Sequence, residues 1–433
     1  MTSTLPRVLA ILPNLIPSTT LTVVKPLLAL QQAGHIRLDL TLESWLSPRQ
    51  LAAADVLVYS RNMLAIYRAA LDAARTWGKP FIYDIDDNLF ELPSLYQQDV
   101  FQLHEQSIAL LDEYLSAAAL VRVYAAPMQE RVQKLNTQVV RVDGPVDWNL
   151  VPSAPPVRDT RRVRIVYATS RVTQDDLASV FLEAIQKILA VYHDRVAFYC
   201  WGYHPPELRA NANVHFLKYV DNYDKFFRRF AHMGFDIGLA PLHDEVFYRS
   251  KTNNKFREYA ACRIAGVYSD VDVYASCIEH GGTGLLVENT AQGWFEAIAR
   301  LVDDAALRTR IQQQSYTYVR THYSLEKTQQ EWLAQIQQVL QLHRAQMKNE
   351  VTVEPRMQPS VVDSAGGSRS VPPLLPGAVG QLAQGGWRFI HGLRQGGLAT
   401  ARRKFSWFTR NLRAQLYLKW LVSLARTYSA SAR

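Results

Sequence analysis

Two kinds of hydrophobic pattern alternate along the first third of the chain. Short apolar runs rich in Val, Ile and Leu predict buried strands, and the longer stretches between them, with apolar side chains three and four residues apart, predict helices. Strands are expected at 7–12, 36–42, 55–60, 80–85, 120–124 and 138–142, and helices at 21–32, 64–76, 99–118 and from Pro127 onwards. This alternation predicts a doubly wound parallel sheet that is covered by helices on both faces.

The same alternation restarts after a break. Residues 143–159 contain four prolines and no periodic pattern, which predicts a linker between two domains. Beyond the linker, strands are expected at 163–170, 196–200 and 213–219, and helices at 174–193, 223–233, 294–302, 305–321 and 324–346. The chain is therefore expected to be an α/β protein with domains at 1–150 and 151–325, followed by a helix at 326–347.

One stretch of the second domain carries most of the candidate chemistry. Between 235 and 288 the pattern predicts a buried strand, a polar loop with Lys251, a helix that begins near Thr252–Asn254, and two further strands. The helix of such a βαβ unit begins just beyond the carboxyl end of a strand, where open parallel sheets bind ligands. Unpaired amides there, beside Lys251 and Lys255, suit an anion such as a diphosphate. The carboxylate of Glu258 suits the hydroxyls of a sugar or a ribose.

This stretch resembles the donor-binding half of a GT-B glycosyltransferase, of the group that includes the retaining nucleotide-sugar enzymes. REYAACRIAGVYSD stands for the family's helix and strand, and GGTGLLVEN stands for its glycine turn. The resemblance implies two Rossmann-like domains facing a cleft, a nucleotide-diphosphate sugar as donor substrate, no other cofactor, and a last helix that crosses back onto the first domain. It places Glu258 on the ribose and Arg171 on the diphosphate. The implied donor-binding residues are Ser170, Arg171, Lys251, Thr252, Asn253, Lys255 and Glu258.

The chain departs from the family at one position. The second glutamate of the family's Glu-x7-Glu motif aligns with Glu258, but Ser250 stands where the first glutamate, which touches the donor sugar, is expected. Two interpretations follow from this difference. The protein is either a glycosyltransferase with an altered sugar site, or a catalytically idle GT-B scaffold that acts as a membrane-tethered assembly subunit.

A run of aspartates follows a strand of the first domain. Asp84, Asp86 and Asp87 in IYDIDDNLF fall at the carboxyl end of strand 80–85, where side chains face the cleft. Asp86 takes the place of the histidine that comparable GT-B enzymes carry, and a carboxylate there suits a general base. Two alternatives stay open, namely Asp84 and Asp86 as ligands of a divalent cation, or Asp86 or Asp87 as a helix cap. We expect Asp86, Asp87 and Lys251 to be catalytic and no metal to be bound.

Charge separates the body of the chain from its tail. The 433 residues carry a net charge of +9 and are 48% hydrophobic, which suits two globular domains. Residues 364–433 hold 11 Lys or Arg and no Asp or Glu, so residues 1–363 hold 37 basic against 39 acidic groups. A body without excess positive charge argues against nucleic-acid binding. Three cysteines without paired spacing fit a reducing cytoplasm.

The tail is expected to have two parts. Residues 348–380, rich in Pro, Gly and Ser, predict a flexible linker. Residues 381–433 predict a basic amphipathic helix, a type of segment that anchors proteins at membrane surfaces; packing on the body or on a partner protein is the alternative. No uncharged apolar stretch is long enough to span a bilayer. The apolar positions of the predicted helix are Leu398, Ala401, Phe405, Phe408, Leu412, Leu416, Trp420 and Leu424.

Taken together, the pattern, the resemblance and the tail predict a cytoplasmic glycosyltransferase that is peripheral on the inner face of a membrane. It is expected to move a hexose-type sugar to the hydroxyl of a glycan or a lipid-linked acceptor in cell-envelope or surface polysaccharide biosynthesis. The alternatives are the idle scaffold and a metal-dependent transferase that uses Asp84 and Asp86.

Overall fold

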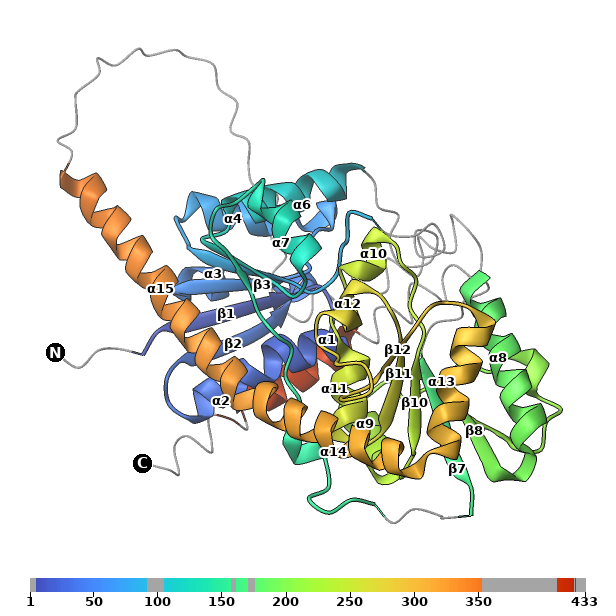
Figure 1. Cartoon of the computed structure of the whole chain (residues 1–433). Coiled ribbons are helices and arrows are strands. Elements are labelled where there is room, and N and C mark those ends of the chain that lie inside the picture. The colour runs from blue at the N-terminus through green and yellow to red at the C-terminus, as the bar shows by residue number, and fades with distance from the viewer. Residues whose placement is uncertain are drawn as a thin grey trace, which may run out of the picture.

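Two parallel sheets, each of six strands, form the body of the protein (Figure 1). The computed structural model describes residues 5–91, 105–156, 161–169, 176–352, 411–423 and 425. Each sheet has a core of buried apolar side chains on both of its faces, because helices cover both faces. The predicted α/β class with two doubly wound domains is confirmed.

The first domain contains the sheet with strand order β2-β1-β3-β4-β5-β6. Its strands are β1 (Arg7–Leu12), β2 (Arg37–Leu42), β3 (Val56–Ser60), β4 (Phe81–Ile85), β5 (Leu120–Val123) and β6 (Val139–Arg141). Its helices are α1 (Pro17–Thr19), η1 (Thr20–Val24), α2 (Lys25–Gln32), η2 (Glu43–Trp45), α3 (Pro48–Ala53), η3 (Ala65–Tyr67), α4 (Ala69–Thr76), α6 (Glu105–Ala117) and α7 (Ala126–Gln133). The chain adds strands in opposite directions from the boundary between β1 and β3. A crevice therefore opens at the carboxyl ends of these two strands.

The second domain repeats this plan with strand order β12-β11-β10-β7-β8-β9. Its strands are β7 (Val163–Thr169), β8 (Val196–Gly202), β9 (Val214–Leu217), β10 (Ile237–Ala240), β11 (Ala265–Ser269) and β12 (Leu285–Val287). The helices, with the short η4 that precedes them, are η4 (Trp148–Leu150), α8 (Asp176–Tyr192), η5 (His193–Arg195), η6 (Pro206–Leu208), α9 (Tyr223–His232), α10 (Val246–Arg249), α11 (Asn254–Ala261), α12 (Asp272–Ala275), α13 (Ala291–Asp303) and α14 (Ala305–His322). The order again reverses, here at β7 and β10.

The helix expected at 21–32 is interrupted. Its first turn is the π-helical η1, and regular α-helix resumes only at Lys25. Pro26 explains the change, because proline has no N–H to donate to the carbonyl of Thr22. Of the helix expected at 99–118, residues 99–104 lie outside the described residues.

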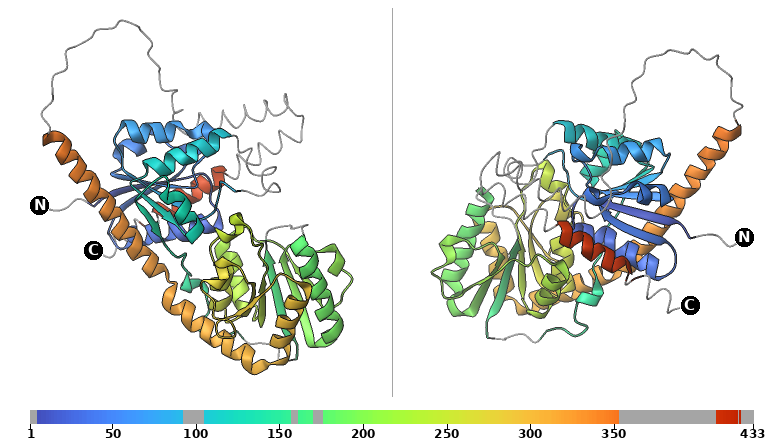
Figure 2. Two further views of the ribbon diagram at one scale, coloured as in Figure 1. Left: turned by 45° about the horizontal axis from the view of Figure 1, so that its top comes forward. Right: turned by 180° about the vertical axis from the view of Figure 1, so that it is seen from behind.

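The last long helix, α15 (Leu325–Thr352), runs from the second domain back along the first (Figure 2). Its Trp332 is fully buried, and the indole Nε1 donates to the carbonyl of Thr22 at 2.8 Å. That carbonyl is the one that Pro26 leaves free, so the interruption of one helix creates the binding point for another. The predicted linker at 348–380 was wrong in its first residues, because 348–352 continue α15.

A buried arginine attaches α15 to the first sheet. Arg122 on β5 is fully buried, donates from Nε to Asp84 Oδ1 at 3.0 Å and bonds through Nη1 to Gln335 of α15. Its guanidinium lies 3.9 Å from the centre of the Trp332 ring. Burial raises the pKa of Asp84 to about 6, against the opposing effect of the Arg122 charge. The expectation that Asp84 faces the cleft was wrong, since its carboxylate is turned inward to this arginine.

The helix at 411–423 packs against the first domain through one face. Gln415 Oε1 accepts from the Leu42 amide at 2.8 Å, Gln31 Nε2 donates to the Val422 carbonyl at 3.2 Å, and Leu418 joins the apolar core. The opposite face remains outside, and its large side chains Leu416, Tyr417 and Trp420 are 58%, 40% and 55% exposed. None of the helices in the described part of the chain combines the length and the apolar character of a membrane-spanning segment.

The Arg122 cluster predicts a large and local stability effect. Arg122→Ala leaves Asp84 in an apolar interior without its cation, which costs on the order of 3 to 5 kcal/mol of unfolding free energy. The matched control is Lys327→Ala, since Lys327 also joins α15 to the first half of the chain, but through an exposed 3.4 Å ion pair with Asp143. The control is expected to cost less than about 1 kcal/mol. Urea unfolding measures both, and equal losses would show that Arg122 does not hold α15.

Candidate active site

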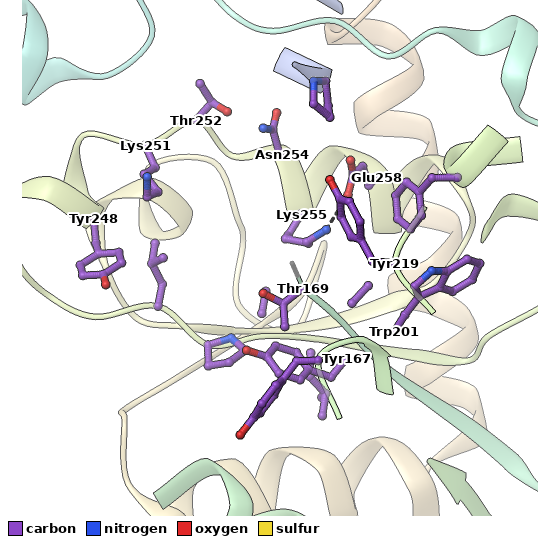
Figure 3. A pocket seen from close by; sticks show the side chains of 18 of the residues that line it. Tyr167, Thr169, Trp201, Tyr219, Tyr248, Lys251, Thr252, Asn254, Lys255 and Glu258 are labelled. Carbon is purple, nitrogen blue, oxygen red and sulfur yellow. Dashed lines mark hydrogen bonds and ion pairs between the residues drawn. The ribbon is translucent and has the colours of Figure 1, made fainter. Parts of the chain in front are cut away.

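A cavity of about 460 Å³ lies between the two domains, at the carboxyl ends of both sheets. The first domain lines it with residues of α1 and of the beginning of η1, and with Arg61, Asp86 and Asp87. The second domain lines it with the ends of β7, β8 and β10 and with the exposed side of α11. Figure 3 shows the side chains of α11 and of the loop before it, pointing into this space.

The second domain brings α11 close to the sheet by packing a tyrosine onto a glycine. A side chain at Gly238 of β10 would meet the ring of Tyr259 at 2.6 Å, so only glycine allows this approach. The hydroxyl of Tyr259 donates to the Leu239 carbonyl at 2.8 Å. With that face of α11 buried, Lys255 and Glu258 on its other face reach the cavity, where Lys255 Nζ lies 2.8 Å from Glu258 Oε2.

The residues predicted to bind a donor divide into three groups. Lys251, Thr252, Lys255 and Glu258 line the cavity. Asn253 does not line it, because its amide donates to the hydroxyl of Tyr323 at 3.0 Å and accepts from Arg257, and Asn254 takes its place on the wall. Ser170 and Arg171 lie outside the described residues.

The carboxylates of the first domain are organised by Arg61, a residue that the sequence reasoning missed. Arg61 follows β3 with a positive φ of 58°, a conformation that only the structure reveals. Its Nε bonds to Asp86 and its Nη2 lies 3.3 Å from Asp87 Oδ2. Asp86 is buried and neutralised by this arginine, whereas Asp87 is shared with a second cation.

That second cation comes from the other domain. Lys251 Nζ lies 2.6 Å from Asp87 Oδ1, and the two side chains are only 12% and 15% exposed. Beside this ion pair, Asn88 Nδ2 donates to Ser250 Oγ at 3.3 Å. The three residues predicted to be catalytic, Asp86, Asp87 and Lys251, are therefore brought together across the domain boundary.

Asp84 and Asp86, the two aspartates considered as metal ligands, each bind an arginine instead. Asp84 accepts from Arg122 and Asp86 accepts from Arg61, so the two aspartates face different cations. Within the part of the chain that the structure describes, no group of three or more His, Cys, Asp or Glu is placed to hold a metal ion. The helix-cap alternative finds no support up to Glu91, since the described residues after Asp87 form turns.

Glu43 is a second residue that the sequence reasoning missed. It follows β2, is 5% exposed, and accepts from Asn62 Nδ2 at 2.7 Å through Oε2. Its Oε1 has no hydrogen-bond partner among the described residues. Burial raises the pKa of Glu43 to about 8, so the side chain is a neutral acid near pH 7. No periodic pattern marks this glutamate as buried, because it is one polar residue at a strand end.

Comparison with known proteins shows similarity to glycosyltransferases. Residues 163–304 match the family model described as Glycosyl transferases group 1, and no curated protein matches the sequence. Sucrose-phosphate synthase from Thermosynechococcus elongatus has a TM-score of 0.56 at 11% identity, over 78% of this chain and 100% of that one. A glycosyltransferase from Rickettsia africae has a TM-score of 0.55 at 15% identity, over 78% and 99%. HepE from Anabaena, in complex with UDP and glucose, has a TM-score of 0.54 at 11% identity, over 76% and 99%. At such low identities the structural matches show a shared fold alone, and the expected resemblance to GT-B proteins is confirmed.

The raised pKa of Glu43 predicts a pH-dependent stability. An acid whose pKa is higher in the folded state stabilises the fold fully below its unfolded pKa, and this contribution is lost as pH rises through the folded value. Between pH 4.5 and about 8 the loss is roughly 1.4 kcal/mol for each pH unit. Glu43→Gln keeps an acceptor for Asn62 and removes this loss, so its advantage over the wild type should grow from pH 5 to pH 8 in urea unfolding. Glu113→Gln, at a surface carboxylate whose pKa is lowered by Arg68, is the control and should gain no such advantage.

Proposed function

We propose that this chain, which has the GT-B fold and a second domain that matches the group 1 glycosyl transferases, moves a sugar from a nucleotide-diphosphate donor to a hydroxyl acceptor. One observation carries the proposal. Lysines at the start of α11 and carboxylates after β4 meet in a single cavity between the domains. A cationic wall opposite an anionic wall is what the transfer of a sugar from a diphosphate to a hydroxyl requires.

The cationic wall would bind the diphosphate. The first amides of α11 are unpaired within the helix and point toward its N-terminus, which favours an anion. Lys251 precedes the helix and Lys255 is its second residue, and both lysines line the cavity. As the glycosidic bond breaks, negative charge grows on the leaving diphosphate, and these fixed groups stabilise it. Ser170 and Arg171 are proposed to contribute from the loop after β7.

Glu258 is proposed to hold the ribose of the donor. It lies one turn along α11 from Lys255 and lines the same cavity. A carboxylate accepts hydrogen bonds from two neighbouring hydroxyls, and ribose presents such a pair. The ion pair with Lys255, 2.8 Å long, orients this carboxylate.

Asp87 is proposed to be the general base for the acceptor hydroxyl. Asp86 is committed to Arg61 in the buried wall, but Asp87 is divided between Arg61 and Lys251. A diphosphate that binds Lys251 competes with Asp87 for the same ammonium group. Arrival of the donor would therefore release the carboxylate that activates the acceptor. The reaction is proposed to need no metal ion, because Lys251, Lys255 and the helix amides supply the positive charge.

The acceptor is proposed to be a glycan or a lipid-linked molecule of the cell envelope, and the protein to work on the cytoplasmic face of a membrane. Support comes from the helix at 411–423. Its outward face joins Leu416, Tyr417 and Trp420 to the exposed cations Arg413 and Lys419. This combination suits the boundary of an anionic bilayer.

The rival candidate is the idle scaffold, which is motivated by Ser250. The purified full chain is tested against sugar nucleotides of uridine, guanosine and adenosine, with magnesium, with manganese and with a chelator. Thermal shift reports binding, since a ligand of the native state raises its stability, and release of nucleoside diphosphate reports chemistry. Binding and release that survive the chelator support the proposal. Binding without release from any donor, also with acceptors added, would favour the scaffold.

Replacing one or the other partner of the Lys251–Asp87 ion pair should change the binding of the nucleoside diphosphate in opposite directions. Lys251→Ala removes a cation from the diphosphate and should slow turnover by about 100-fold or more while the fold is kept. Asp87→Asn removes the internal competitor of the diphosphate, so the nucleoside diphosphate should bind roughly tenfold more tightly, although turnover falls by about 100-fold or more because the base is lost. Calorimetry gives the dissociation constants and product release gives the rates.

The control for this pair is Lys187→Ala. Lys187 is a surface lysine of the same domain that bonds to Gln292 at 2.9 Å and does not line the cavity. It should change neither quantity. Weaker diphosphate binding by Asp87→Asn would contradict the competition between Asp87 and the donor, and unchanged turnover in Lys251→Ala would remove Lys251 from the mechanism.

The outward face of the helix at 411–423 gives a separate prediction. The full chain should sediment with vesicles that contain phosphatidylglycerol and less with pure phosphatidylcholine, because the tail is basic. Replacing Leu416 and Trp420 by Ala should weaken this binding about tenfold or more, since two large apolar side chains no longer enter the interface. Trp77→Ala, at a tryptophan that is 42% exposed on the body, is the matched control. Equal binding by the double variant would show that this face does not meet the membrane.

A further inference from the structure

The end of the cavity that lies away from Lys251 is aromatic and holds a buried hydrogen-bond donor without a partner. Trp201, near the end of β8, lines the cavity and is only 2% exposed. Its indole Nε1 has no hydrogen-bond partner among the described residues. Figure 3 shows Trp201 beside Tyr219, with Glu258 nearby. Buried polar groups are nearly always hydrogen-bonded, so an unpaired indole N–H at a cavity wall points to a ligand that pairs it.

The indole cannot turn to find a partner elsewhere. Its ring makes an edge contact with Phe226, with centres 5.2 Å apart, and a tilted contact with Phe230 at 5.8 Å. The guanidinium of Arg229 lies 5.3 Å from the centre of the same ring. Strand geometry adds a further constraint, because Cys200 packs into the core on one face of the sheet and Trp201 into the core on the other. The direction of the N–H is therefore fixed by packing.

The position of Trp201 follows the order of parts in the proposed donor. Lys251 stands at one end of the cavity for the diphosphate, and Glu258, which is paired with Lys255, comes next for the ribose. Lys255 Nζ lies 5.9 Å from the centre of the Phe226 ring, and the same ring packs on Trp201. A nucleotide laid along this line puts its base against Trp201. The aromatic side chains Tyr203, Tyr219, Tyr223 and Phe226 also line this end and offer stacking surface.

We propose that the Trp201 N–H donates a hydrogen bond to the O4 oxygen of uracil or the O6 oxygen of guanine, which makes this residue a specificity determinant against bases that carry an amino group at that position. This inference rests on the proposed function, and it narrows the donor to sugars of nucleoside diphosphates with a keto group at that position, such as those of uridine, thymidine and guanosine. Cytosine carries an amino group where uracil has its O4, and adenine carries one where guanine has its O6. An amino group facing the indole leaves two buried donors unpaired, and sites built on a buried hydrogen bond discriminate strongly against such analogues.

The test compares two pairs of ligands whose bases carry either a keto or an amino group at this position. Binding of UDP against CDP, and of GDP against ADP, is measured by calorimetry on the full chain. At least one keto member should bind about tenfold or more tightly than its amino counterpart. Trp201→Phe keeps an aromatic ring but has no N–H, so it should shrink that ratio toward one. Trp294→Phe is the matched control, because Trp294 is a fully buried tryptophan of the same domain whose Nε1 is also without a partner among the described residues, but it does not line the cavity.

A second measurement needs no variant and so does not depend on how Trp201→Phe folds. The thiocarbonyl analogue of the preferred ligand, 4-thio-UDP or 6-thio-GDP, keeps the shape of the base but accepts a hydrogen bond more weakly. It should bind the wild type several-fold less tightly than its oxygen parent and bind Trp201→Phe about as well as the parent does. An unchanged keto to amino ratio in a folded Trp201→Phe, or no preference in the wild type, would overturn the role of Trp201. Absence of binding by every nucleoside diphosphate would instead overturn the proposed function.

Discussion

One carboxylate, Asp87, is shared between cations from two domains, and the geometry of the cavity depends on that sharing. Arg61 holds it from the first domain and Lys251 from the second, at 3.3 Å and 2.6 Å. Both side chains of the interdomain pair are mostly buried, and separating the domains would break the pair and let water reach both ions. The pair therefore links the domains at the cavity and at the same time keeps the candidate phosphate-binding lysine occupied. A ligand that replaces Asp87 at Lys251 changes both of these conditions in one step.

The geometry of the cavity also depends on contacts that lie outside it. α15 spans both domains and is attached to the first by Trp332 and by the buried Arg122. Arg122 in turn neutralises Asp84, the residue two places before Asp86 on the same strand end. The strand that presents Asp86 and Asp87 is thus fixed from behind by a helix that begins in the other domain. This rigid support explains how a chain with two separate sheets keeps carboxylates and lysines within hydrogen-bonding distance.

The sequence predicted what depends on periodicity and on strand ends. Alternating apolar runs specify two doubly wound sheets, and a helix that starts after a buried strand places Lys251, Lys255 and Glu258 at a ligand edge. It did not predict what depends on neighbours that are distant in sequence. Asp84 turns inward because strand register puts Arg122 directly beside it on β5, and the separate strands carry no mark of that pairing. Arg61 depends on a positive φ, and the choice of Asn254 over Asn253 depends on where one helical turn begins.

The interdomain network also bears on the choice between an enzyme and an assembly subunit. Ser250 removes one carboxylate from the second domain, yet Asp86 and Asp87 of the first domain bring two carboxylates beside it, and Asn88 contacts Ser250 itself. A protein whose task is only to hold two domains and a partner together gains little from buried ions, because well-packed apolar side chains stabilise such a contact as well or better. A cavity that both domains line instead gathers six charged side chains, namely Arg61, Asp86, Asp87, Lys251, Lys255 and Glu258. That arrangement is unfavourable for a simple scaffold and favourable for a protein that must bind a diphosphate and then remove a proton, so the charge distribution supports the transferase over the idle subunit.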